Sequence, residues 1–416
     1  MKYLRLAFLA FATAASFVRA QDEQRAQPPT EIPDFSNLDE FIYEPKSTVT
    51  LGFRHLSGAK TSFSGKGLLS ALENNGPATG GNINRSYHDG GVLADARITA
   101  RLDGNGNPVT DPASGAQAFD LIAPDGKTNT WNYADARQLA TDGFVAFHSY
   151  SASIVDAAIR ERATSSTNGL ELAVSRDMGK FFGTRATWTV TAGMSVNDLS
   201  AKTSDLVLAN LTTVTDLYSL YGQVVPGAPY SAPSSSTTTV LDASGNAVLN
   251  EDGSTQTLTT DTTVLLGNSP ASRTSTVTAN STSVVNRWKL KGAYYTFRAG
   301  PTVLVPIFSR LRASFSVGGA MVYAGTNYTV TQTYTPEIGA DISDTSTSAT
   351  SRLLPGYYAD ATLQFDLTDR AGFYAGAVFQ SAGTYTQNLE STTAHYSTKI
   401  DLANQQGLRA GMSIRF

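Results

Sequence analysis

The chain has 416 residues, of which only 16% are charged and 41% are apolar. It contains no cysteine, which excludes disulfides, thiolate metal sites and a cysteine nucleophile. The net charge of -4 argues against a nucleic-acid partner, because phosphate binding needs clustered lysine and arginine. With 35 glycines and no disulfides, the chain must gain its stability from backbone pairing and packing.

Residues 1–20 are predicted to form a secretory signal peptide. Lys2 and Arg5 precede an apolar stretch from Leu6 to Ala15, and small residues stand before a cleavage site after Ala20. A membrane helix needs about 20 apolar residues, so this stretch is too short to be one. No other segment approaches that length, and we expect no membrane helix in the mature chain.

Residues 21–45 are acidic and carry four prolines, at positions 28, 29, 33 and 45. This composition is typical of an extended segment, which we interpret as a periplasmic lead-in. The alternative is a short docking peptide that contacts a periplasmic partner through Phe35, Phe41 and Tyr43.

Alternation of apolar and polar residues begins at Lys46. Val49, Leu51 and Phe53 share one face, while small or polar residues share the other. The same pattern returns in seven further segments of about ten residues each. They are residues 169–179, 184–198, 293–305, 311–323, 357–367, 373–380 and 408–416.

The connections between these eight predicted strands alternate between short and long. Short turns follow the second, fourth and sixth strands, and four long polar loops are expected at about 58–167, 198–286, 324–355 and 383–398. Transmembrane barrels have this asymmetry, with short periplasmic turns and long extracellular loops. Two loop segments resemble each other, LDGNGNPVTDPASG from Leu102 and LDASGNAVLNEDGS from Leu241, and each is predicted to form a hairpin tip.

The pattern predicts an all-β fold, an antiparallel up-and-down transmembrane β-barrel over residues 46–416, most simply with eight strands. In hydrocarbon an unpaired backbone group costs several kcal/mol, so such a sheet must close. Ten strands remain possible if Phe144–Ser153 and Leu93–Leu102 join the barrel, and a soluble β-sandwich is the other alternative. An aromatic girdle is expected at the strand ends, formed by Trp288, Tyr294, Tyr323, Tyr357 and Phe373.

Charged residues recur on the polar face, which would line the lumen of the barrel. They are Arg54, Glu171, Arg298, Arg312, Asp360, Asp366, Arg409 and Arg415. In an eight-stranded barrel side chains fill the lumen, so we expect a buried ion network with a structural role. The excess of arginine leaves an alternative, an anion-selective constriction in a wider barrel.

Other candidate chemistry is sparse, and no catalytic, cofactor or metal site is predicted. His55 and His395 could meet on neighbouring strands, although their strand phases differ. Asp103, Asn105 and Asn107 have the spacing of a calcium loop, but Pro108 replaces the turn glycine. His88 and His148 are expected to be isolated surface residues.

The last strand carries the most specific motif. Its alternating apolar residues are Leu408, Ala410, Met412, Ile414 and Phe416. In this respect the chain resembles the small outer-membrane barrels of the OmpA/OmpX transmembrane type, by strand pattern over Lys46–Phe416 rather than by residue identity. The resemblance implies that these five residues form the signal read by the outer-membrane assembly machinery. It also implies a location in the outer membrane of a Gram-negative bacterium, in contact with outer-membrane lipid and lipopolysaccharide.

These observations favour a non-enzymatic outer-membrane protein that displays large polar loops, with a role in the envelope or in surface contact. A passive porin or narrow anion-preferring channel is the first alternative. An outer-membrane hydrolase that uses His55, His395 and Ser57 is the second. The loops carry no motif that identifies an extracellular ligand.

Overall fold

The computed structural model describes residues 46–69, 75–140, 143–156, 158–163, 166–224 and 227–416. All of them belong to one unit, Lys46–Phe416. The predicted signal peptide and acidic lead-in lie outside the described residues. The described residues form strands and one short 3-10 helix, η2 (Ala136–Gln138), so the predicted all-β class is confirmed. Among them, no helix has the length and apolar character needed to cross a bilayer.

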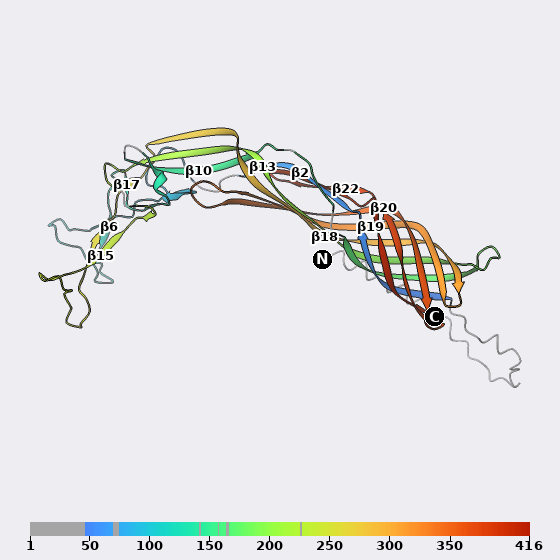
Figure 1. Ribbon diagram of the computed structural model, residues 1–416. Coiled ribbons are helices and arrows are strands. Elements are labelled where there is room, and N and C mark those ends of the chain that lie inside the picture. The colour runs from blue at the N-terminus through green and yellow to red at the C-terminus, as the bar shows by residue number, and fades with distance from the viewer. Residues whose placement is uncertain (1–45, 70–74, 141–142, 157, 164–165, 225–226) are drawn as a thin grey trace. The chain divides into compact units, whose positions relative to one another are not determined.

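The largest sheet has 14 strands, and a closed series of antiparallel pairings runs through part of it. We call the strands in this series the ring (Figure 1). In pairing order they are β1 (Ser47–Ser57), β12 (Thr167–Lys180), β13 (Thr187–Ser219), β18 (Ser272–Phe308), β19 (Leu311–Tyr334), β20 (Ile342–Asp366), β21 (Ala371–Ser381) and β24 (Gln405–Arg415). β24 then pairs with β1, which closes the series.

Short connections gather at one end of the ring, which we call the turn end. They are residues 181–186, 309–310 and 367–370, as the sequence predicted. Ser47 and Phe416 lie at the same end, where the Ser47 amide donates to the Phe416 carbonyl at 3.0 Å and the reverse bond measures 2.9 Å. Among the described residues, the turn end therefore has little backbone outside the ladders.

Four ring strands continue far beyond the ring. β13 has 33 residues, β18 has 37, β19 has 24 and β20 has 25. Much of the predicted loops 198–286 and 324–355 is therefore strand. The alternation continues in the same phase, but the inward face is now apolar and the outward face polar: Trp288 and Leu290 are buried, whereas Lys289 and Lys291 are exposed.

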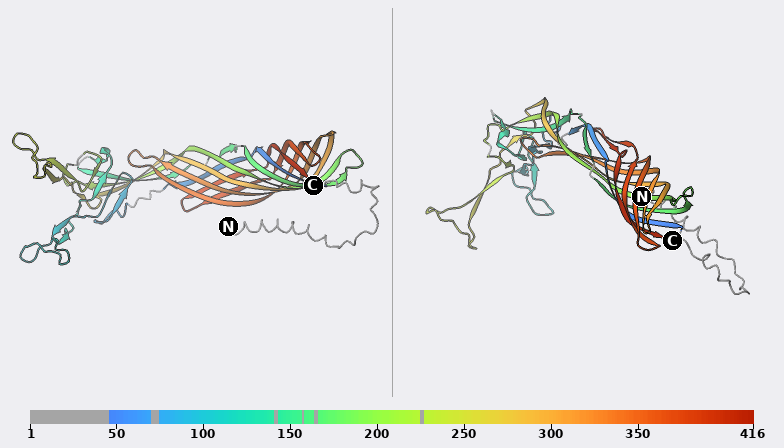
Figure 2. Two further views of the ribbon diagram at one scale, coloured as in Figure 1. Left: turned by 90° about the horizontal axis from the view of Figure 1, so that it is seen from below. Right: turned by 45° about the vertical axis from the view of Figure 1, so that its right-hand side comes forward.

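Further strands complete a wall around these continuations, and we call this part the extension (Figure 2). They are β2 (Lys60–Leu69), β10 (Phe144–Ile154), β11 (Arg160–Ala163), β22 (Thr384–Glu390) and β23 (Ala394–Asp401), with β9 (Leu139–Ala140) at the edge. β10 pairs with β13 at residues 209–219, β2 pairs with β10, β11 and β23, and β23 pairs with β22. Gln387 on β22 donates its Nε2 to the Ser348 carbonyl of β20 at 2.6 Å.

The ten-strand alternative does not describe the ring. Phe144–Ser153 belongs to β10 in the extension, and Leu93–Leu102 contributes only the three-residue strand β5 (Ile98–Ala100). Neither segment pairs with the ring strands at the level where they close on one another.

The main apolar core lies inside the extension. Phe63 stacks between Trp288 and Tyr328, with ring centroids 6.4 and 5.9 Å apart. This corrects the predicted girdle, because Trp288 and Tyr294 face inward and are 1% and 0% exposed. Their even positions on β18 share the face of the buried residues, which strand parity imposes. Tyr323, Tyr357 and Phe373 are exposed as predicted.

A second apolar cluster belongs to what we call the head, residues 75–140 and 220–271. Its four-stranded sheet contains β3 (Arg85–Tyr87), β4 (Gly90–Val92), β8 (Trp131–Tyr133) and β14 (Tyr230–Ser231), and β7 (Lys127–Thr128) pairs with β17 (Leu266–Gly267). Two hairpins are formed by β5 with β6 (Phe119–Leu121) and by β15 (Ser235–Thr239) with β16 (Thr257–Asp261). The predicted hairpin tips are confirmed, and much of the two longest predicted loops is folded.

Candidate functional site

The outward face of the ring is apolar on every strand, and we call this surface the outer band. Cross-strand register joins Leu51 to Leu172, Leu172 to Met194, Met194 to Phe297 and Phe297 to Met321. Large apolar side chains are exposed all around the ring. Examples are Leu51, Phe53, Leu170, Val190, Phe297, Phe315, Val317, Leu363, Phe373, Leu408, Met412, Ile414 and Phe416. Exposure of this kind on so many adjacent strands is unusual for a surface in water.

The inward face of the ring holds an ion network around two carboxylates. Glu171 lies 3.5 Å from Arg54 Nε and 3.2 Å from Arg298 Nη2, and it also pairs with Arg409. Asp360 pairs with Arg298 Nη1 at 2.6 Å and with Arg409 Nη1 at 2.8 Å. The five side chains are at most 8% exposed. The structure thus brings five of the predicted lumen charges into one buried cluster.

Glycine stands opposite four of the charged residues on a neighbouring strand. In register, Arg54 is opposite Gly169, Arg298 is opposite Gly193, and Arg409 is opposite Gly376. Glu171 is likewise opposite Gly52, where a Cβ would collide with the Tyr374 hydroxyl oxygen. Alternation of large and small residues lets the side chains of a narrow barrel interdigitate, and Gly52 makes room for Tyr374, which donates to Glu171 at 3.2 Å.

The other three predicted lumen charges form a second cluster nearer the turn end. Asp366 accepts from Arg312 at 3.1 Å and also pairs with Arg415. These side chains are 17% to 24% exposed, more than those of the five-residue cluster around Glu171 and Asp360, which we call the upper cluster. The sequence list of eight residues therefore falls into two separate ion clusters.

A layer of neutral polar side chains lies beyond the upper cluster. Arg54 donates to Ser195 Oγ at 2.6 Å and to Gln380 Oε1 at 3.0 Å. Gln380 then bonds Gln405, whose Nε2 donates to Tyr294 Oη at 2.7 Å. Beyond Tyr294 the interior becomes the apolar core of the extension. The interior is thus filled from the ion network into the extension.

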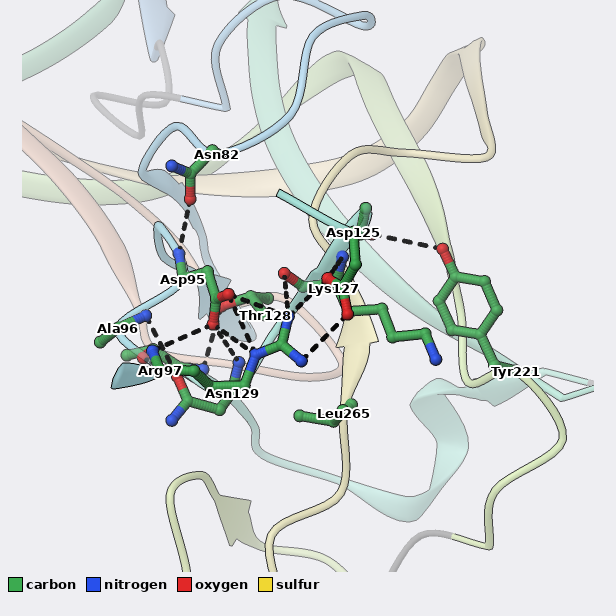
Figure 3. A network of polar contacts seen from close by, with 12 residues as sticks. Asn82, Asp95, Ala96, Arg97, Asp125, Lys127, Thr128, Asn129, Tyr221 and Leu265 are labelled. Carbon is green, nitrogen blue, oxygen red and sulfur yellow. Dashed lines mark hydrogen bonds and ion pairs between the residues drawn. The ribbon is translucent and has the colours of Figure 1, made fainter. Parts of the chain in front are cut away.

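The head is held together by buried or partly buried arginines. Arg97 bridges two loops, with its Nε 2.9 Å from Asp95 Oδ1 and its Nη1 3.1 Å from Asp125 Oδ2 (Figure 3). Hydrogen bonds from Arg97 hold the pKa of Asp125 below its usual range. Arg273 of β18 attaches the head to the long strands: it pairs with the fully buried Asp216 of β13 at 2.6 Å and donates to the Gly76 carbonyl at 2.8 Å, and Asp216 also accepts from Tyr87 at 2.5 Å.

An aspartate and a histidine that the sequence left unpaired meet beneath the head. Asp89 accepts from the His148 amide at 2.8 Å, and its Oδ2 lies 2.5 Å from His148 Nδ1. His148 is 20% exposed and stacks on Tyr150 with ring centroids 6.0 Å apart. The contact between Asp89 and His148 Nδ1 orients the imidazole. The hydrogen bond from the His148 amide shows that Asp89 also fixes β10 against the turn between β3 and β4. Sequence spacing could not reveal it, because the partners are 59 residues apart.

The other candidate sites do not assemble. His55 bonds Asn168 at 2.8 Å, whereas His395 bonds Glu390 at 3.1 Å, so the two histidines have different partners, in line with their different strand phases. Ser57 donates to a backbone carbonyl. No group of three or more histidine, aspartate or glutamate side chains within the described ranges could hold a metal ion.

The calcium-like segment is part of a turn that occurs twice. Asp103 accepts from the amides of Asn105 and Asn107, and Asp242 does the same for Ser244 and Asn246. In both hairpins, backbone bonds also join three short segments in a cycle, residues 101, 109 and 118 in one and 240, 248 and 256 in the other. The two tips are therefore one structural motif used twice, with each aspartate committed to its own turn.

The comparisons with family models and with curated proteins found no match. Solved structures do align. The outer membrane protease OmpT of Escherichia coli aligns over 93% of this chain and 100% of its own, with 9% identity and a TM-score of 0.27. The attachment invasion locus protein Ail of Yersinia pestis covers 88% and 99%, with 9% identity and a TM-score of 0.19. A FadL homologue of Pseudomonas aeruginosa covers 89% and 90%, with 9% identity and a TM-score of 0.16. Likeness of this size transfers no activity or ligand to this chain.

Proposed function

We propose that the chain is an integral outer-membrane β-barrel protein of a Gram-negative bacterium, with the ring as an eight-stranded transmembrane barrel. The outer band carries this proposal. On β19 it runs from Leu311 to Tyr323, and at about 3.3 Å per residue and a tilt of about 40° it spans about 30 Å, the thickness of a bilayer's hydrocarbon core. A soluble barrel would point its charges outward, whereas here they are buried inside.

The turn end would face the periplasm, and the extension and head would face the exterior. Leu408, Ala410, Met412, Ile414 and Phe416 lie on the outer band of β24, with Leu408 65% exposed. This position leaves them available to the assembly machinery before the barrel enters lipid. The partners expected from this placement are outer-membrane lipid, lipopolysaccharide and that machinery.

The barrel serves as a closed, non-enzymatic anchor for the head rather than as a pore. The burial of Arg54, Glu171 and Arg298 supports this, because an open channel would leave the charges at its constriction in contact with water. The head presents exposed apolar residues on both hairpins, among them Leu102, Phe119 and Leu241. We therefore propose contact with an external surface or ligand as its role.

Conductance across a planar bilayer tests the closed lumen. The protein is refolded, its insertion is verified by a gel mobility that shifts on boiling, and current is recorded. We expect no steady single-channel steps. Steps that disappear in Arg54→Gln would instead support the anion-channel alternative, which the excess of arginine over carboxylate in the upper cluster favours.

A further inference from the structure

A cationic groove lies on the outer surface just beyond the outer band. In register, Lys202 of β13 is opposite Lys289 of β18, Ser200 is opposite Lys291, and Ser204 is opposite Arg287. All four basic side chains are exposed. Cations are therefore crowded on two adjacent strands, over about 10 Å along the barrel axis between Arg287 and Lys291.

The groove exists because β13 lacks a ladder partner on one side here. Among the described pairings, β12 reaches only Asn197 of β13, and β10 begins at Ala209. The gap forms a groove of about 920 Å³, with the basic residues on its rim and Ala201 and Trp288 among its lining. Arg162 of β11 adds a fifth cation across the gap, where its Nε donates to Thr203 Oγ1 at 3.2 Å.

No protein carboxylate neutralises this cluster among the described ion pairs, since none of them includes Lys202, Lys289, Lys291 or Arg287. Asp205 is paired with Arg160, and Asp198 accepts the Asn168 amide. Like charges directly opposite each other on a sheet are destabilising, so the cluster needs an external anion.

The height of the groove points to the source of that anion. Lys291 is four residues beyond Tyr295 of the outer band, about 10 Å along the barrel axis. Lys289 and the opposite Lys202 are two residues further along the strand, about 15 Å beyond the outer band. The headgroup region outside the hydrocarbon core is about 5 to 8 Å thick, so Lys291 lies just beyond it and the other two lysines lie about 5 Å further out, where phosphates carried on the outer side of a glycolipid headgroup would stand. Apart from the exposed Arg352 of β20, the side chains just beyond the outer band on other ring strands are mostly neutral. They include Asn168, Asn327, Ser351, Ser381 and Gln406.

We propose that this groove binds the phosphate groups of an outer-leaflet glycolipid headgroup. Lysine and arginine are strong phosphate donors, and basic residues at this depth attract anionic headgroups. The proposal rests on the membrane placement proposed above and assigns it one lipid-contact side, the β13–β18 face.

The experiment uses the full chain inserted in vesicles that contain either lipid A or its dephosphorylated form. Insertion is measured first, by vesicle flotation and heat-modifiable gel mobility. Lipid retained by the detergent-extracted protein is then titrated. The test variant is Lys202→Gln/Lys289→Gln/Lys291→Gln. The matched control, Lys60→Gln/Lys66→Gln/Lys399→Gln, removes three exposed lysines elsewhere on the extension.

We expect the wild type and the control to retain lipid A and to prefer it to the dephosphorylated form. The test variant should bind lipid A about 100-fold more weakly, because three charges near a headgroup are lost. Equal retention by the test variant and the control would overturn the proposal, as would equal retention of both lipids. Complete competition by millimolar inorganic phosphate would reassign the groove to a free anion. Failure of the wild type to float with vesicles would overturn the membrane placement itself.

Discussion

Substitution of Glu171 by glutamine should weaken the barrel strongly. Glu171 is 1% exposed and contacts three arginines, two of them at 3.5 and 3.2 Å. At an effective dielectric constant of about 20, each contact at this distance is worth about 5 kcal/mol of gross attraction. The amide keeps some hydrogen bonds, and loss of the charge relieves the cost of burying it. Measured cases of a broken buried ion pair then suggest a net loss of about 3–5 kcal/mol in the free energy of unfolding.

Urea titration of the vesicle-inserted protein, followed by tryptophan fluorescence, measures this loss. Asp177→Asn is the control, because Asp177 is exposed on the same strand and its carboxylate accepts the Gly179 amide of its own turn. We expect it to change the free energy of unfolding by less than about 0.5 kcal/mol. The double variant Glu171→Gln/Arg409→Gln should lose less free energy of unfolding than the two single variants together, because removal of one arginine reduces the repulsion among the arginines that Glu171 had neutralised. Equal stability of Glu171→Gln and Asp177→Asn would refute the ion network as a stabilising element.

Two further predictions concern the outer band and the head. Val317→Arg places a charge near the middle of the outer band of β19 and should lower the free energy of unfolding in vesicles by about 2–4 kcal/mol. Thr329→Arg faces outward on the same strand but in the extension, and it should change this free energy little. Similar losses for the two variants in a urea titration would contradict burial of the outer band in lipid. Burial raises the pKa of Tyr150 and of Tyr218 to about 12, against about 10 in an unfolded chain. The unfolded state therefore releases these protons first, so stability should be complete below pH about 10 and fall as pH rises towards 12. In a titration followed by phenolate absorbance, Tyr150→Phe should have one tyrosine fewer that ionises near pH 12. An unchanged number of such tyrosines would contradict the raised pKa of Tyr150.

The sequence predicted the ring well because a strand with one apolar and one polar face has a simple alternating pattern. Apolar residues at every second position, such as Leu51 and Phe53, can only form one face of a strand. The charges between them, such as Arg54, then share the opposite face. Alternation along each strand was therefore enough to predict that the eight charged residues share the inward face. Their division into two clusters depends on the stagger between neighbouring strands.

The extension and head were harder to predict, because their pairing partners are distant in sequence. β2 pairs with β23, more than 300 positions away, and no local pattern encodes such a ladder. Asp89 and His148, or Arg273 and Asp216, likewise meet only after the chain has folded. Strands rich in serine and threonine, as in β20 from Ile342 to Ser351, also have the composition of a polar loop.

The proposed membrane placement explains why the chemistry of the two faces is exchanged along the long strands, because what lies outside the sheet changes along them. Where the proposed exterior is lipid, apolar side chains such as Phe297 face outward and Arg298 is confined to the interior with its carboxylate partners. Where the exterior is water, burial of apolar surface is favourable again, so Trp288 turns inward while Lys289 faces out. Each strand thus changes its pattern at the level where the solvent changes, between Tyr295 and Lys291 on β18. The backbone ladder is continuous across this level, so the same hydrogen bonds that close the barrel also support the extension that carries the head.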